Sequence, residues 1–200
     1  GVVVAVGADV DVPADAAVIE FEREEDQPPL TLYPGLIDAY LPLEVERDED
    51  EPPPGRHALI HPDFAFDAAH WPVEKVEAHR RAGFTTAVIA PETGLLRGRS
   101  VLANLGEGGL LANLLREHVA QYAHFNERAP GRVYPQSLMG AVTLFRQTLL
   151  DAEWQLRSRE IWQRNPAQAR PEWIAGVDAL APVLAGEQPL VFVAGDTLDS

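Results

Sequence analysis

The hydrophobic and polar positions at the start of the chain predict a small β segment. Two runs, Val2–Val6 and 18–22, are rich in β-branched residues and are separated by breakers that include Pro13, a pattern typical of a hairpin or small sheet. Acidic residues and a pair of prolines then interrupt the pattern. We therefore expect a boundary near 27–34, between this segment and the rest of the chain.

The following residues alternate between strand-like and helical patterns. The apolar run Leu36–Leu41 is interpreted as a strand, and residues 44–55, which are acidic and rich in proline, as a solvated loop. A short helix is expected to begin at Pro72 and to end before Gly83, because proline suits a first helical turn and glycine a helix end. The side chains expected to face inward from this helix are Val73, Val76 and Ala82. The apolar run 84–90 then predicts a buried strand.

The most regular helical pattern begins at Ser137. This serine is a good N-cap, Asn165-Pro166 stops the pattern, and the apolar positions between them recur at helical spacing. These positions are Leu138, Ala141, Val142, Phe145, Leu149, Ala152 and Leu156. Another helix is expected over 171–185, bent at Pro182, and a buried strand over 189–194.

Residues 100–125 fit two structures. Four leucines between 110 and 115 have helical spacing, whereas the glycine-rich stretch 106–109 fits the tip of a hairpin. The other elements follow the order strand, helix, strand, two helices, strand, which favours an α/β fold with parallel strands. Three such strands complete neither a sheet of usual size nor a barrel, so we expect further chain after Ser200.

Composition narrows the classes of partner. The 200 residues are 46% hydrophobic and 24% charged, as in ordinary globular proteins. The formal charge of −15 opposes binding to nucleic acid and to anionic lipid, and no apolar run approaches the ~20 residues of a membrane span. We expect a soluble, acidic protein that binds neither nucleic acid nor membrane. The compartment stays open, because cysteine is absent and a targeting signal would lie upstream of Gly1.

The segment Tyr33–Ala39 has the sequence Y-P-G-L-I-D-A and is the first of several short motifs that can be compared with known families. The later ones are Arg81–Thr86, Arg97–Ser100, Tyr134–Ala141, Arg146–Thr148 and Asp151-Ala152. In this order, and over nearly the whole chain, the phrases resemble the amidohydrolase superfamily, and most closely its imidazolonepropionase-like members. In that superfamily the first phrase leads from a small β-sandwich into the first strand of a barrel.

The resemblance implies a fold in two parts. Residues 1–33 are expected to be part of a small β-sandwich domain, and residues 34–200 to be the N-terminal portion of a TIM-like (β/α)8 barrel, truncated at both ends. The sites of such barrels lie at the C-terminal ends of the strands. The reading of strands and helices from their patterns agrees with this α/β class.

The resemblance also implies a metal-dependent hydrolase of amide or cyclic amide C–N bonds. In the family, a divalent metal such as zinc is held by an H-x-H pair that closes the first strand, a histidine on a later strand, often a carbamylated lysine, and a late aspartate. The metal polarises the carbonyl group of the scissile bond and lowers the pKa of a bound water to near neutrality.

The sequence departs from the family at these metal positions. The H-x-H positions hold Tyr40 and Pro42, and Val193 stands at the later histidine. The one lysine, Lys75, lies in a predicted surface helix. Proline and valine offer no side-chain ligand atom, and a phenol is a poor ligand for zinc-like ions. We therefore expect no metal cofactor, and the catalytic residues stay unassigned.

Histidines elsewhere offer an alternative metal cluster. Its candidate ligands are His57, His61, His70, Asp63 and Asp67. Their irregular spacing, with Pro62 among them, favours histidines that pack on a loop or surface. His118 and Tyr122 lie four residues apart and would share a face only in a helix, so core or interface packing is expected for them.

Arg97 and Arg99 are the candidate substrate-binding residues. They flank Gly98 in a loop after a strand, a suitable place for an anion-binding hook, although a role in bracing the loop is the alternative. Asp38 is interpreted as a structural carboxylate. The tryptophans expected to be buried, against the barrel or against a partner, are Trp154, Trp162 and Trp173.

Three hypotheses on function follow. The first is an amidohydrolase-like protein without the usual metal site, a pseudoenzyme that serves as a binding or scaffold subunit beside an intact amidohydrolase partner domain. The second is an active metal-dependent amidohydrolase whose site is completed by residues beyond Ser200. The third is an oligomerisation module, which an exposed apolar patch on the late helices would favour. A small-molecule ligand and a homo-oligomer are the partners compatible with them.

Overall fold

The computed structural model describes residues 4–21, 28, 30–44, 57–67, 70–125 and 134–194. The chain divides into two compact units, 1–34 and 35–200, each of which is described by itself. The acidic loop expected over 44–55 lies outside the described residues except for Glu44. None of the described helices has the length and apolar content of a membrane span.

The described residues of the first unit contain no strand. Residues 4–6 and 18–21, which were expected to pair, have no strand partner, and their apolar side chains are exposed. The predicted hairpin is therefore wrong for residues 4–21, and the assignment of residues 1–33 to part of a β-sandwich domain stays a prediction. A lone hairpin is only marginally stable in water, because it needs a third strand or a helix to cover its apolar face.

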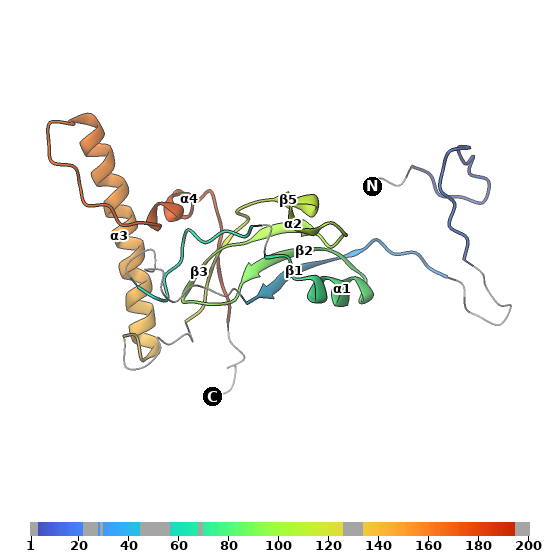
Figure 1. Cartoon of the computed structure of the whole chain (residues 1–200), viewed down its shortest axis with the longest axis horizontal. Helices are drawn as coiled ribbons and strands as arrows, with labels where there is room; N and C mark the ends of the chain where they lie inside the picture. The colour runs from blue at the N-terminus through green and yellow to red at the C-terminus, as the bar shows by residue number, and fades with distance from the viewer. Residues whose placement is uncertain are drawn as a thin grey trace. The chain divides into compact units, whose positions relative to one another are not determined.

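The second unit begins with a βαβ arrangement (Figure 1). β1 (Leu36–Leu43) and β2 (Phe84–Pro91) pair in parallel, with α1 (Val73–Arg81) between them in the chain. β2 also pairs antiparallel with β4 (Val101–Asn104), which pairs antiparallel with β5 (Leu114–Arg116). The first sheet thus has the order β1-β2-β4-β5, and the predicted strand, helix and strand are confirmed.

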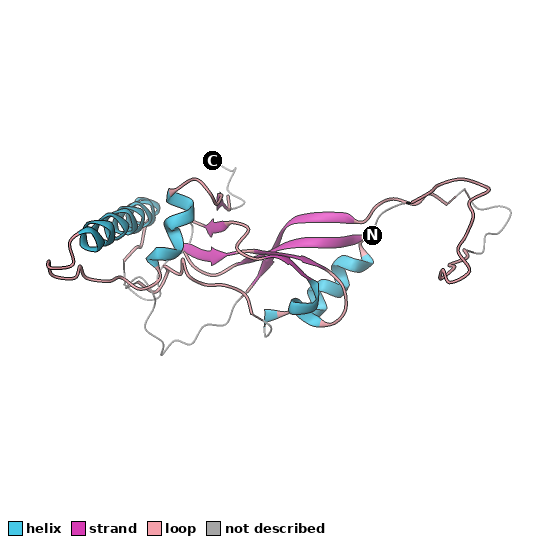
Figure 2. Ribbon diagram, turned by 90° about the horizontal axis from the view of Figure 1, so that it is seen from above, coloured by secondary structure: helices cyan, strands magenta, loops and turns pink. Residues whose placement is uncertain are grey.

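A second sheet has the order β3-β6-β7. β3 (Leu96–Arg99) is antiparallel to β6 (Gln121–Ala123), and β6 is parallel to β7 (Leu190–Phe192). The long helix α3 (Leu138–Arg164) lies between β6 and β7 in the chain and stands to one side of the strands (Figure 2). β7 confirms the strand expected over 189–194, in a shorter form.

α3 begins and ends where its sequence predicts. Ser137 is the N-cap, and its hydroxyl oxygen accepts the backbone N–H of Gly140 at 3.2 Å, while Asn165 is the C-cap. Most of the apolar positions expected to face inward are buried or partly buried, but Leu138 is exposed. Local capping and periodicity were therefore sufficient to place this helix.

Residues 100–125 combine the two structures that their pattern allowed. A short helix, α2 (Gly109–Asn113), uses the leucine spacing, and Gly108 and Gly109 have positive φ in the turn that leads into it. The flanking residues form β4, β5 and β6. Neither one continuous helix nor a simple hairpin is formed.

The helix expected over 171–185 is wrong for its first part. Residues 171–176 are not helical, and only η3 (Val177–Leu180) and α4 (Ala181–Leu184) follow. Gln155 of α3 instead binds this segment: its side-chain amide accepts the backbone N–H of Ile174 at 2.6 Å and donates to its C=O at 3.1 Å. The backbone of this segment therefore bonds to α3 and not within a helix of its own.

Two apolar clusters form the main core of the second unit. One lies between α1 and the first sheet and includes Val76, Ala87 and Ile89. Val73 and Ala82 of the same region are exposed, contrary to expectation. The other cluster lies against α3 and contains Leu59, Ile60, Leu95, Leu96, Ala123, Ala141, Phe145, Ala152, Val177 and Leu180.

We predict that Phe145→Ala lowers the free energy of unfolding by about 3–5 kcal/mol, because it opens a cavity in the cluster against α3. Phe145 is 5% exposed and packs against the rings of Phe125 and Phe192, with ring centroids 5.5 Å and 5.4 Å away. The matched control, Leu111→Ala, removes a side chain that is 72% exposed and should change this free energy by less than about 0.5 kcal/mol. Urea unfolding measures both, and equal losses would contradict the assignment of the core.

Candidate binding site at the end of the first strand

An irregularity in the β1–β2 pairing sets the directions of the side chains at the end of β1. Between Asp38 and Leu41, β1 has one residue more than the facing stretch of β2. Both of these residues contact α1: Asp38 Oδ2 lies 3.1 Å from His79 Nε2, and Leu41 packs in the cluster that includes Val76. Tyr40, which lies between them, packs on the opposite face of the strand.

Asp38 holds this irregular stretch of backbone. Its Oδ1 accepts the backbone N–H of Tyr40 at 2.9 Å, while its Oδ2 faces the ring of His79. Both oxygens are therefore engaged within the fold. These contacts are those of a structural carboxylate, the role interpreted for Asp38 from the sequence.

Tyr40 packs into a small cluster that joins the two sheets. Its ring stacks on Tyr122 of β6, with ring centroids 5.7 Å apart and planes inclined by 14°. Ala90 is buried in the same cluster, and Val193 packs against it. Two positions at which the family resemblance places metal ligands, 40 and 193, thus do come together, in an apolar and aromatic setting.

Arg97 reaches the same place from β3. Its side chain is 3% exposed, its Nη1 donates to Tyr40 Oη at 3.3 Å, and its Nε donates to the Gly94 carbonyl at 3.2 Å. A guanidinium group keeps its positive charge in proteins. A buried cation therefore lies in hydrogen-bond contact with the side chain that occupies the first H-x-H position.

Tyr122 keeps its proton at neutral pH. Burial raises the pKa of its phenol above the ordinary value of 10.0, and the nearby Tyr40 adds to the rise, while a hydrogen bond with Ser100 lowers it. The phenol of Tyr122 and the guanidinium of Arg97 are thus present at the end of β1 as hydrogen-bonding groups. The sequence pattern did not reveal the contact between Tyr40 and Tyr122, because the two residues lie on strands far apart in the chain.

Arg99 has different neighbours from Arg97. Its Nη2 donates to the carbonyl of Asp63 at 2.9 Å, and it stands opposite Gln121 in the β3–β6 pairing. Arg99 Nε and Gln121 Oε1 are buried, and neither has a hydrogen-bond partner among the described residues. Burial lowers the pKa of Arg99, while Asp63 and Glu117 raise it.

The backbone between the two arginines requires a glycine at position 98. Its φ of 110° is in the region that favours glycine, and a Cβ at this position would lie 2.6 Å from Phe64 Cβ. The binding of a substrate by Arg97 and Arg99 stays a prediction. What the structure adds is that Arg97 contacts Tyr40 and that Arg99 contacts the loop at Asp63.

The loop histidines bind neighbouring backbone and carboxylate groups. His57 Nε2 lies 2.7 Å from the carbonyl oxygen of Tyr134, and His61 Nε2 lies 2.8 Å from the carbonyl oxygen of Ala58. His70 Nδ1 lies 2.7 Å from an Asp67 carboxylate oxygen. In the described ranges of the chain, no group of three or more His, Asp or Glu side chains is arranged to hold a metal.

The other candidates also find local partners. Lys75 Nζ donates to the carbonyl of Pro42 at 2.8 Å, so this lysine contacts the second H-x-H position as a hydrogen-bond donor. His118 has a φ of 51° in the turn before β6, so it shares no helical face with Tyr122. Trp154 and Trp173 are 53% and 44% exposed, which makes their predicted burial against the barrel wrong in this chain.

Comparisons with models of protein families and with curated protein sequences find no match. A comparison of structures finds similarity to an amidohydrolase from Thermotoga maritima MSB8, with a TM-score of 0.62 and 16% sequence identity. The fold is amidohydrolase-like. The similarity covers 81% of this chain and 45% of the Thermotoga protein, so the chain spans less than half the length of that amidohydrolase. At this level of identity the likeness describes the fold alone.

We predict that Tyr40→Phe lowers the free energy of unfolding by about 1–3 kcal/mol, because the buried Arg97 guanidinium loses a hydrogen-bond acceptor. Tyr33→Phe is the matched control, since that ring is 81% exposed, and it should have almost no effect. Urea unfolding of both variants provides the measurement. Equal stabilities of the two variants would show that the bond to Tyr40 contributes nothing.

The raised pKa of Tyr122 predicts a loss of stability at alkaline pH. The unfolded chain loses this proton near the ordinary value of 10.0, before the folded chain does. The contribution of Tyr122 to the free energy of unfolding is therefore fully present below pH 10, and it is lost as the pH rises through the pKa that Tyr122 has in the folded chain. Unfolding free energies measured at about pH 8 and about pH 11 should differ less for Tyr122→Phe than for the wild type. The same difference in both proteins would contradict the prediction.

Proposed function

We propose that the protein is an amidohydrolase-like protein that does not use the metal centre of that superfamily and that serves as a binding or scaffold subunit. The observation that carries this proposal is the set of contacts around Tyr40, at the end of β1. Stacking on Tyr122 and the hydrogen bond from Arg97 occupy the side chain that stands at the first H-x-H position.

We interpret the second unit as successive parts of a (β/α)8 barrel. The pairs β1–β2 and β6–β7 are parallel, and each pair has helix between its strands in the chain, as barrel units require. In this reading, Tyr40, Pro42 and Val193 lie at the C-terminal ends of barrel strands, where such folds carry their sites. The amidohydrolase-like fold supports the reading.

The residues at these strand ends do not fit a divalent metal. Val193 has no ligand atom, and the carbonyl of Pro42 already accepts a hydrogen bond from Lys75. Arg97 adds a buried positive charge beside Tyr40. This charge would repel a bound metal ion. Two like unit charges 4 Å apart repel by ~4 kcal/mol at an effective dielectric constant of 20, and the repulsion between a guanidinium and a divalent ion at that distance is twice as large.

The same groups suit recognition of a ligand. Tyr122 keeps its proton, and the guanidinium of Arg97 keeps its positive charge, so the electrostatic setting at the end of β1 is positive. Such a setting favours a ligand that presents an oxygen acceptor, either neutral or anionic. It does not favour the ionisation of a water molecule, which in this superfamily depends on the metal.

We predict that the purified full-length protein, expressed with added zinc and without chelators, contains far less than one equivalent of zinc, manganese or iron. The physical reason is the unsuitable donor set and the like charge of Arg97. Elemental analysis provides the measurement, with a zinc-dependent amidohydrolase purified in parallel as the positive control.

Stoichiometric metal in the full-length protein would contradict the proposal. Hydrolysis of an amide or cyclic amide that a chelator abolishes would favour the alternative, an active metal-dependent amidohydrolase completed by residues beyond Ser200. If metal is found and the Tyr40→Phe variant retains it, the ligands of that metal lie away from the end of β1.

A further inference from the structure

α3 has a buried face and, opposite it, a face on which exposed apolar residues lie among polar ones such as Thr143 and Arg157. The face toward the core carries the buried residues Ala141, Phe145, Thr148, Ala152 and Gln155. Five other apolar residues are at least half exposed. Leu138, at 59%, lies in the first turn, and we call the remaining four the outer stripe: Met139 at 74%, Leu150 at 57%, Trp154 at 53% and Ile161 at 50%. With 3.6 residues per turn, these four positions lie within about 60° of one another and roughly opposite the buried face. A solvated helix face is normally polar, so the outer stripe needs a partner.

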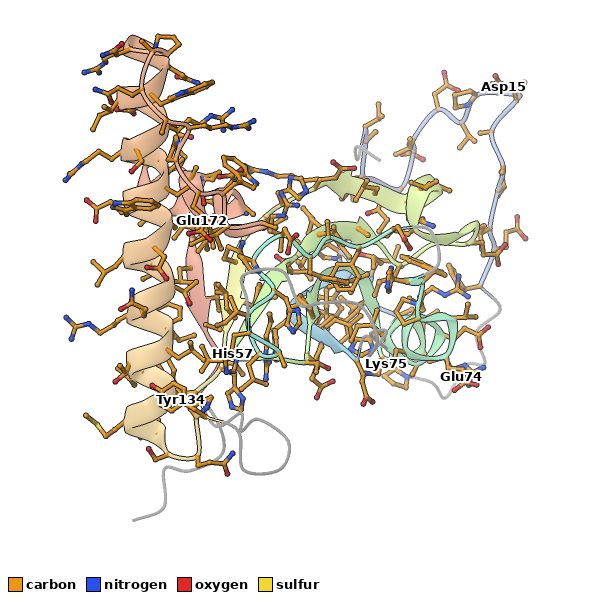
Figure 3. The ribbon with its side chains drawn as sticks, turned by 60° about the vertical axis from the view of Figure 1, so that its left-hand side comes forward. Asp15, His57, Glu74, Lys75, Tyr134 and Glu172 are labelled. Carbon is orange, nitrogen blue, oxygen red and sulfur yellow. The ribbon has the colours of Figure 1, made fainter. Side chains whose placement is uncertain are left out.

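The segment that follows α3 packs on other positions of the helix. Gln155 binds the backbone of Ile174, the guanidinium of Arg159 lies over the ring of Trp173 at 5.4 Å, and Arg170 lies over Trp162 at 5.8 Å. Positions 155, 159 and 162 are on the side of the helix away from the outer stripe. Figure 3 shows side chains along α3 projecting away from the strands, on the flank of the helix that faces outward.

Charged residues follow one edge of the outer stripe at heptad spacing. Arg146, Glu153 and Glu160 are exposed and are separated by seven residues each, so they lie in one line along the helix. Glu153 is paired with Arg157 at 3.4 Å. The positive Arg146 and the negative Glu160 therefore lie on this edge at equal distances on either side of Glu153.

We propose that the outer stripe binds a second copy of this chain, with the two α3 helices antiparallel about a twofold axis at the level of Glu153 and Trp154. In this arrangement Arg146 of each copy faces Glu160 of the other, and the two Trp154 side chains meet near the axis. The two Glu153 side chains also face each other there, each paired with Arg157 of its own chain. In a parallel arrangement the edge that carries Arg146 and Glu160 would lie on opposite sides of the interface in the two copies, so these charges would not face each other. The complementary pairs matter because two chains of net charge −15 otherwise repel each other.

The first test is the oligomeric state of the full-length protein, measured by sedimentation velocity over a range of concentrations. We expect a dimer, and we expect Trp154→Asp to weaken the dimer at least about thirtyfold, as for the central aromatic residue of an interface. Leu111→Asp is the matched control, because that apolar side chain is exposed on α2, away from α3, and it should leave the dimer unchanged. Circular dichroism checks that each variant keeps its helices.

The second test separates a second copy from any other partner. Arg146→Glu and Glu160→Arg should each weaken self-association, because each creates two like-charge contacts across the axis. An equimolar mixture of the two variants should restore the dimer as a heterodimer, because each charge then faces its opposite.

The proposal is overturned if the full-length protein is monomeric at about 100 µM, a result that would mean further chain or a different protein covers the outer stripe. It is also overturned if Trp154→Asp leaves the dimer intact, or if the mixture of charge variants associates no better than either variant alone.

Discussion

Tyr40 links the two sheets of the second unit, and much of the local structure depends on the contacts of this one side chain. Its ring stacks on Tyr122 of the other sheet, and its phenol oxygen accepts a hydrogen bond from the buried Arg97. A stacked aromatic pair contributes about 0.5–1.5 kcal/mol beyond the burial of its surface, whereas a buried charge without hydrogen bonds is far more costly. The bond to Arg97 therefore adds a polar link between β3 and the end of β1 to the stacking of the two rings.

The same contacts explain why binding and not hydrolysis is proposed. Tyr40 and Val193, where the sequence resemblance would place metal ligands, both pack against the cluster of Ala90, Ala120 and Tyr122. Arg97 places its positive charge beside Tyr40. Neither this charge nor the apolar side chain of Val193 suits a divalent metal, which is why the proposal does not include one.

α3 connects the core of the chain with its proposed partner. One face of the helix packs Phe145 into the core, and Gln155 organises the segment that returns to β7. The opposite face presents Trp154 between charges of both signs. Self-association through this face is compatible with a scaffold role, because it leaves the end of β1 available for a ligand.

The sequence by itself determined the local elements and the residue types at the positions of the H-x-H pair. Ser137 and Asn165 bounded α3, Pro72 and Gly83 bounded α1, and Tyr40 with Pro42 excluded the H-x-H pair, because capping, turn geometry and donor chemistry are read from adjacent residues. Only the tertiary structure decided which distant residues meet. The stacking of Tyr40 on Tyr122, the irregular register that aims Tyr40 away from α1, and the capture of Ile174 by Gln155 all join segments far apart in the chain. The hairpin expected near the start failed for the same reason, since a strand needs a neighbouring strand that local propensity cannot supply.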